Sequence, residues 1–153
     1  MAEISPGAHV HNEAQLGDGV SVAPGAVIYA GARIGAGTEI GACAVVHAGT
    51  VIGARCVIES GVTLGKRPRL RPGSSAARKG VLRPLKLADD VIVCCGAVVY
   101  AGSTIAHLVI IGDQSQVRER VSIGASSIVG RGSSVDFDAT LGERVSIQSG
   151  VYV

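Results

Sequence analysis

The sequence predicts an all-β fold in which six-residue repeats stack into a parallel β-solenoid. Three observations predict it: a six-residue period of aliphatic residues, a small residue two positions before each of them, and an unusual composition. Apolar residues make up 47% of the 153 residues, whereas aromatic residues make up 3% and Trp is absent. Any core must therefore consist of Val, Ile, Leu and Ala, and this much aliphatic surface argues against disorder despite 22 glycines.

The six-residue period is unbroken in two separate runs. The first run is Ile4, Val10, Leu16, Val22, Ile28, Ile34, Ile40, Val46, Ile52, Ile58 and Leu64. The second run is Leu87, Val93, Val99, Ile105, Ile111, Val117, Ile123, Val129, Val135, Leu141, Ile147 and Val153. We expect all of these side chains to form the core.

A small or β-branched residue precedes most of these positions by two, as Ala26 precedes Ile28 and Cys56 precedes Ile58. Residues two apart point the same way only on a strand, so each hexad predicts a short strand with two inward side chains. Because such strands cannot close a core alone, successive turns must stack and bury one continuous aliphatic column.

Glycine often follows the aliphatic position directly. The glycines concerned are Gly17, Gly35, Gly41, Gly53, Gly65, Gly112, Gly124, Gly130 and Gly142. We expect a bend after each strand, with backbone angles that other residues avoid.

The recurring pattern [Leu/Ile/Val]-Gly-x-x-[small]-x resembles the hexapeptide-repeat acyltransferase superfamily, and within it the sugar N- and O-acetyltransferases. The resemblance implies a left-handed parallel β-helix with three hexads in each triangular coil; the period itself gives neither the hand nor the number. The chain length and the single break in the period predict one domain over residues 1–153 with an extruded loop at 65–86. Because Val153 lies at a strand position, we also expect further coils or a terminal helix to cover that end.

The loop at 65–86 is strongly basic. Between residues 66 and 86 it holds eight of the 14 Lys and Arg residues and no acid. Such groups can bind phosphates, so the loop predicts contacts to acetyl-CoA or acyl-CoA, or to a nucleotide sugar. The predicted contact residues are Lys66, Arg67, Arg69, Arg71, Arg78 and Lys79. A solvated loop without function is the alternative.

A line of outward isoleucines predicts a contact surface. Ile92, Ile110 and Ile128 are 18 residues apart, which on three-hexad coils places them above one another on one face. The resemblance implies a homotrimer, and this stripe is the predicted interface. The alternative is that β-branched residues simply favour strands. Val27 and Val45 form a shorter stripe, whose alignment with the first depends on how many hexads the loop replaces.

His107 is the candidate catalytic base. Its spacing, His-x-x-x-Ile-Gly, is similar to the base-bearing segment of the acyltransferases, and His is the usual base near neutral pH. The rival interpretation is an exposed corner histidine without a task. His47 is a weaker candidate. The segment Arg118-Glu119-Arg120 is expected one hexad beyond the His107 corner, as an anion-binding group or, more simply, a surface ion pair.

Several partners and cofactors are not expected. The net charge of +2 predicts no nucleic-acid partner, and no apolar run suggests a membrane span or a secretory signal, so we expect a cytoplasmic protein. The four cysteines have no metal or redox spacing, so we expect reduced thiols and no metal.

The sequence therefore predicts an enzyme that transfers an acetyl or acyl group from CoA to an amine or hydroxyl of a sugar, with a nucleotide-linked sugar as the expected acceptor. The alternative from another class is a non-catalytic solenoid that serves as a scaffold or assembly module, or a fragment of one. A γ-type carbonic anhydrase is a further alternative, but it needs three histidines around a metal, and the four here are scattered.

Overall fold

The computed structural model describes residues 1–153 and contains 22 short strands in three parallel sheets. Sheet A consists of β1 (Glu3–Ile4), β4 (Ser21–Val22), β7 (Glu39–Ile40), β10 (Val57–Ile58), β13 (Ile92–Val93), β16 (Ile110–Ile111), β19 (Ile128–Val129) and β22 (Ser146–Ile147). Sheet B consists of β2 (His9–Val10), β5 (Val27–Ile28), β8 (Val45–Val46), β11 (Thr63–Lys66), β14 (Val98–Tyr100), β17 (Gln116–Val117) and β20 (Ser134–Val135). Sheet C consists of β3 (Gln15–Leu16), β6 (Arg33–Ile34), β9 (Val51–Ile52), β12 (Lys86–Leu87), β15 (Thr104–Ile105), β18 (Ser122–Ile123) and β21 (Thr140–Leu141).

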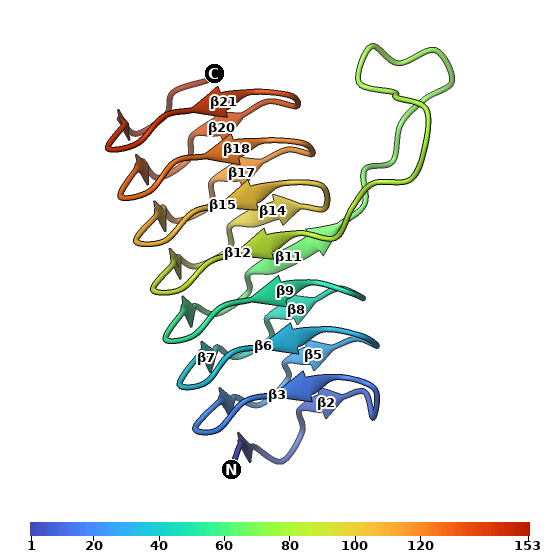
Figure 1. The fold of residues 1–153 in the computed structure, drawn as a ribbon, viewed down its shortest axis with the longest axis vertical. Coiled ribbons are helices and arrows are strands. Elements are labelled where there is room, and N and C mark those ends of the chain that lie inside the picture. Colours follow the sequence, from blue (N-terminus) through green and yellow to red (C-terminus); the bar gives the residue numbers. More distant parts are fainter.

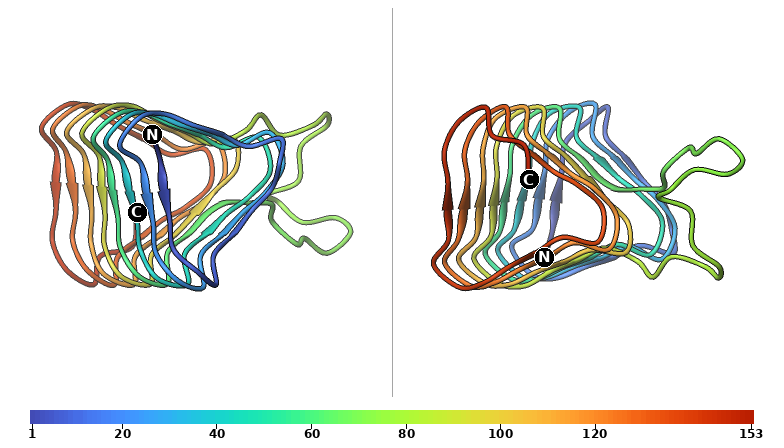
Figure 2. Two further views of the ribbon diagram at one scale, coloured as in Figure 1. Left: turned by 90° about the horizontal axis from the view of Figure 1, so that it is seen from below. Right: turned by 90° about the horizontal axis from the view of Figure 1, so that it is seen from above.

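Successive strands enter sheets A, B and C in turn, so three hexads make one coil and the coils stack along one axis (Figure 1). Residues 18 apart are therefore neighbours, as Val27 and Val45 are in sheet B. Seen from the C-terminal end, the chain turns clockwise as it rises toward the viewer (Figure 2), so the coil is left-handed. The left-handed triangular β-helix implied by the resemblance is confirmed.

The core is the aliphatic column that the six-residue period predicts, except at its two ends, where Ile4 and Val153 are exposed because no further coil covers them. Twenty-nine buried residues form one cluster, and Ile34, Ile52 and Ile123 are each at most 3% exposed within it. Cys56 occupies one of the small inward positions and is fully buried. All four cysteines are free thiols.

Inward hydroxyls tie neighbouring coils together. Each of five hydroxyls donates a hydrogen bond of 2.6–2.8 Å to the carbonyl 15 residues further along, at a corner of the chain; the donors are Thr38, Ser103, Ser115, Ser127 and Ser133. Thr50 is the exception, because its buried hydroxyl has no partner. Its expected acceptor is the carbonyl of Gly65, but the strand is irregular between Leu64 and Lys66.

Glycine is required directly after the strands for a different reason from the one expected. Apart from Gly65, none of them has a positive φ. Positive φ occurs instead three residues after the aliphatic position, both at glycines and at residues such as Leu108 and Arg120. A Cβ on Gly35 or Gly124 would lie 2.5 Å from a backbone carbon of the next coil. Close stacking of the coils, rather than a special backbone angle, therefore requires glycine there.

Residues 67–84 leave the solenoid between β11 and β12, at the corner from sheet B to sheet C (Figure 1). Gly65, Lys66 and Lys86, which were expected in the loop, lie in these two strands. The coil then resumes in register, because Lys86 pairs with Val51 and Leu87 with Ile52 in sheet C. Leu85 is fully buried at an inward position. The insertion therefore adds a loop without adding a hexad to the stack.

Candidate functional site

The corner from sheet B to sheet C carries long side chains, and we call it the open corner. The residues that directly follow the sheet B aliphatic positions are His11, Tyr29, His47, Gly65, Tyr100, Arg118 and Asp136. The rings of Tyr29 and His47 stack with centroids 5.6 Å apart. Lys66 and Arg118 each lie 5.1 Å from the centroid of the Tyr100 ring. The open corner is thus a column of aromatic and charged groups.

The loop folds along this corner toward the C-terminal coils and is held there by ion pairs. Arg78 Nη2 lies 2.6 Å from Asp138 Oδ2, and Arg120 Nε lies 2.6 Å from Asp138 Oδ1. Arg120 also donates to the carbonyl of Ala76 at 2.8 Å. The hydrogen bond from Arg120 is the main reason that the pKa of Asp138 is lowered. We call the group Arg78, Asp138 and Arg120 the loop clasp.

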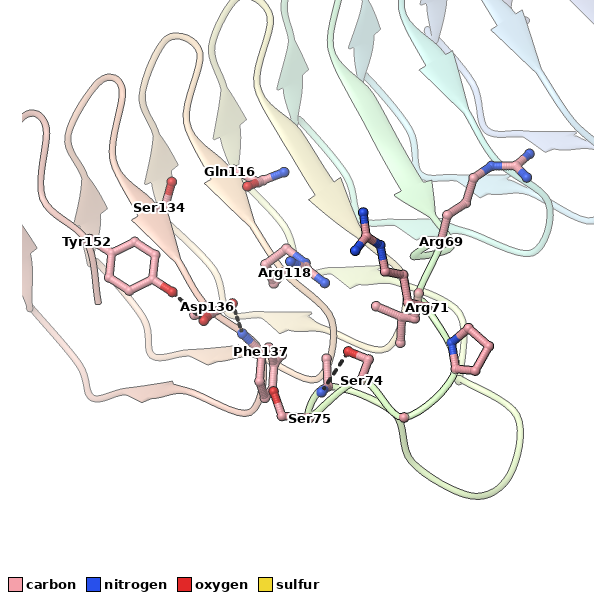
Figure 3. Close-up of a pocket in the computed structure, with 14 residues that line it drawn as sticks. Arg69, Arg71, Ser74, Ser75, Gln116, Arg118, Ser134, Asp136, Phe137 and Tyr152 are labelled. Carbon is pink, nitrogen blue, oxygen red and sulfur yellow. Dashed lines mark hydrogen bonds between the residues drawn. The ribbon is translucent and has the colours of Figure 1, made fainter.

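A cavity of about 670 Å³ lies between the loop and the last coils (Figure 3). Its lining includes Arg69 and Arg71 from the loop and Arg118 from the open corner. Ser74, Ser75, Gln116, Ser134, Asp136 and Tyr152 add polar groups. In Figure 3 the guanidinium groups of Arg71 and Arg118 point toward the cavity, whereas that of Arg69 points away from it. Two guanidinium groups with hydroxyls beside them form a site suited to a phosphate group. We call it the loop cavity.

Arg118 is held in place by Glu119, which is fully buried and whose two carboxylate oxygens accept hydrogen bonds of 2.9 and 3.1 Å from it. The pair keeps the pKa of Arg118 raised, with the hydrogen bond from Arg118 to Glu119 as the largest cause. The expectation of a surface ion pair one hexad beyond the His107 corner is therefore wrong. The segment lies two hexads beyond it, at the open corner, and the Glu119 carboxylate is fully buried rather than at the surface.

The structure separates the six loop residues predicted to contact a cofactor. Arg69 and Arg71 line the cavity, whereas Arg78 belongs to the loop clasp. Arg67 donates to the carbonyl of Leu82 across the loop, and Lys66 donates to the hydroxyl of Tyr100 at 3.5 Å. Lys79 is exposed. Sequence reasoning thus found the loop but could not assign its members to separate tasks.

His107 lies at another corner, the one from sheet C to sheet A. Its side chain is exposed, next to Leu108, which has a positive φ and is 53% exposed. Asp89 occupies the equivalent position of the preceding coil, and Asp90 follows it. Arg55 donates a hydrogen bond to Asp90, and this bond is the main reason that the pKa of the Asp90 carboxyl is lowered. The charge of His107 makes the smallest contribution to the same lowering. These two acids were not identified from the sequence. Within one chain, His107 and the loop cavity lie at different corners.

His47 is the second candidate histidine. It is partly buried at the open corner, and its pKa is lowered by burial first and by the nearby charge of Lys66 second. A neutral imidazole near neutral pH follows from both causes. Its ring stacks on that of Tyr29, and His47 does not line the loop cavity.

The isoleucine stripe is continuous on sheet A. Ile92 pairs with Ile110, and Ile110 pairs with Ile128. Val57 extends the stripe by one coil, since it pairs with Ile92. Ile128 is 43% exposed. Val27 and Val45 lie on sheet B, so the shorter stripe belongs to another face.

These features define a left-handed solenoid of hexapeptide repeats with a basic cavity at one corner. The sequence model of the family described as bacterial transferase hexapeptide (six repeats) matches residues 31–66. The resemblance predicted from the repeat pattern is confirmed by this match and by the fold. No curated protein sequence matches the chain.

Solved structures share this fold. The UDP-N-acetylglucosamine acyltransferase of Francisella novicida superposes with a TM-score of 0.76 and 19% identity, covering 98% of this chain and 62% of that one. LpxA from Acinetobacter baumannii gives a TM-score of 0.68 and 19% identity, covering 98% of this chain and 66% of that one. The UDP-N-acetylglucosamine acyltransferase from Campylobacter jejuni gives a TM-score of 0.54 and 19% identity, covering 90% of this chain and 68% of that one. The chain thus spans under two thirds of the length of the first of these.

No helix long and apolar enough to cross a membrane is present.

Proposed function

We propose that this chain is part of, or is, an acyltransferase that moves an acetyl or acyl group from CoA to an amine or hydroxyl of a nucleotide-linked sugar. The loop cavity is the observation that carries the proposal. Both CoA and nucleotide sugars bear phosphates, and Arg71 and Arg118 present two guanidinium groups to the cavity that Arg69 also lines. The likeness to two UDP-N-acetylglucosamine acyltransferases supports the same class of reaction.

In this proposal His107 is the general base. It takes a proton from the acceptor hydroxyl or amine as that group attacks the thioester carbonyl, and the CoA sulfur leaves as the tetrahedral intermediate collapses. The exposed position of His107 leaves its ring open to a substrate. Asp89 and Asp90, at the same corner, are the acids available to orient it or to stabilise its protonated form.

The proposal includes a homotrimer formed through the stripe on sheet A. His107 lies three residues before Ile110, at the corner where the chain enters sheet A, so the base lies beside the proposed interface. A neighbouring copy would then help to enclose the substrate. A sizing measurement that gives a monomer at working concentration would remove this part of the proposal.

Calorimetry with CoA tests the phosphate site. We expect saturable binding in the micromolar to millimolar range that weakens at high salt. Replacing Arg69 and Arg71 by Ala should reduce the affinity about tenfold or more, because charge-assisted hydrogen bonds to phosphate are lost. Arg33→Ala is the matched control, since Arg33 is an exposed arginine on sheet C, away from the cavity. Absence of saturable heat would favour the non-catalytic scaffold.

Turnover tests the base. His107→Ala should lower the rate of acyl transfer by about a hundredfold or more, whereas CoA binding to the loop cavity should be unchanged. Unchanged turnover would remove His107 from the mechanism.

A further inference from the structure

The third corner of the solenoid, from sheet A to sheet B, gathers sulfur and carboxylate groups. Glu59, Cys95 and Asp113 follow β10, β13 and β16, which are successive neighbours in sheet A. The three residues therefore emerge at one corner from three consecutive coils. Neither His107 nor the loop cavity belongs to this corner, so the cluster is separate from the site proposed above.

The donor atoms of the three side chains converge. The thiol sulfur of Cys95 and one carboxylate oxygen each of Glu59 and Asp113 all lie within 4.8 Å of one another. The backbone holds them there: the Cys95 N–H donates to Glu59 Oε1 at 3.0 Å. In addition, the Gln114 N–H donates to the Cys95 carbonyl at 2.9 Å. Ladder hydrogen bonds of this kind fix the spacing of the coils, so the cluster is preorganised.

The charge of the cluster is not compensated by the protein. Neither Glu59 nor Asp113 forms an ion pair with a Lys, Arg or His side chain. Arg131 shares a shallow hollow with Asp113 but makes no salt bridge to it. Carboxylates this close repel each other, and a cation between them removes that repulsion.

We propose that Glu59, Cys95 and Asp113 bind a divalent cation of the zinc type, with water completing a tetrahedral set of ligands. A thiolate together with two carboxylates suits a borderline-soft metal, whereas calcium and magnesium take oxygen ligands only. Sequence reasoning assigned the cysteines no chemical role because it looked for ligands close together in the chain. Here they are brought together by stacking, 18 and 36 positions apart.

Cobalt is the probe for this site, because a thiolate bound to Co²⁺ gives a charge-transfer absorption band in the near ultraviolet. The reduced protein, stripped of metal with a chelator, is titrated with Co²⁺ and then with Zn²⁺. We expect a thiolate band that saturates at one equivalent of Co²⁺ and is abolished by one equivalent of Zn²⁺, which binds more tightly to such ligands.

Variants assign the ligands. Cys95→Ser should abolish the band, and Asp113→Asn should weaken Co²⁺ binding about tenfold or more. Cys43→Ser is the matched control, because Cys43 is also an exposed thiol at this corner but lies outside the cluster, and it should leave the band unchanged. The proposal is overturned by absence of a saturable band, or by a band that survives Cys95→Ser. Equal loss in the Cys43 and Cys95 variants would overturn it as well.

Discussion

The open corner and the corner from sheet C to sheet A, which we call the tight corner, differ in the residue that directly follows each strand. At the tight corner these residues are Gly17, Gly35, Gly53, Ala88, Ala106, Gly124 and Gly142. At the open corner they are mostly aromatic or charged. The backbones of successive coils approach so closely at the tight corner that a Cβ on Gly53 would lie 2.6 Å from the Ala88 carbonyl carbon.

The comparison shows where a repeat of six residues can carry binding groups. Side chains accumulate in stacks where coils leave room, and the long insertion occurs at that corner rather than at the tight one. At the tight corner the functional candidate, His107, comes one residue later, outside the close backbone contact. Four experiments test whether the two corners differ in this way.

Gly124→Val should have the largest effect. A Cβ there would lie 2.5 Å from the Gly142 carbonyl carbon, so the coils must separate, at a cost of about 3 kcal/mol or more of unfolding free energy. Urea denaturation measures it. Gly142→Val is the matched control from the same column, because nothing lies within 4 Å of its Cβ, and we expect a change below about 0.5 kcal/mol. Equal losses would mean that close stacking is not what distinguishes the tight corner.

Thr38→Val and Thr50→Val form a second pair. Thr38 Oγ1 donates to the Gly53 carbonyl at the tight corner and accepts the Cys56 N–H, so its loss should cost about 1–3 kcal/mol. The buried Thr50 hydroxyl is without a partner because the loop diverts the chain at the open corner. Its replacement should be neutral or stabilising by up to about 1 kcal/mol. The same denaturation assay compares them, and a large loss for Thr50→Val would reveal a partner that the open corner provides.

His47 reports the environment of the open corner. Its pKa should lie below 6.5 in an NMR titration, because burial and the charge of Lys66 both disfavour the protonated form. The folded pKa is lowered, so the stability contributed by the neutral ring is present above the ordinary pKa and decreases as the pH falls below it. Lys66→Ala should raise the midpoint but leave it below 6.5, since burial is the larger cause. A return to 6.5 would contradict that ranking.

The loop clasp should have the smallest effect on global stability. Asp138→Asn removes partly exposed ion pairs, so the unfolding free energy should change by less than about 1 kcal/mol, while amide exchange in residues 67–84 accelerates. The depressed pKa of Asp138 keeps the clasp charged down to pH values below 3.8 and releases it as the carboxyl is protonated. Lys79→Ala, in the same loop, is the control and should leave exchange unchanged. Unaltered exchange in Asp138→Asn would show that other contacts hold the loop.

The fold was predictable from the sequence because the six-residue alternation is local. Each pair such as Ala26 and Ile28 indicates which face of the strand points inward. Strands this short can bury that face only by stacking coil on coil. The stripe of Ile92, Ile110 and Ile128 could be placed for the same reason once a coil of three hexads was assumed. The role expected for the glycines that follow the strands was wrong. Glycine is required there because the backbone of the next coil lies too close for a Cβ, and not because of the glycine's own backbone angles.

The repeat, the inward column and the position of the basic loop follow from the sequence alone, since all three depend on neighbours in the chain. Which residues share a corner depends on the tertiary structure, because the contacts that decide it join residues 15 to 60 positions apart. The tertiary structure buries Glu119, pairs Arg78 with Asp138 rather than with the cavity, and brings Cys95 next to two acids from other coils. Coil closure and the path of the loop are settled by long-range packing, which a six-residue pattern does not record.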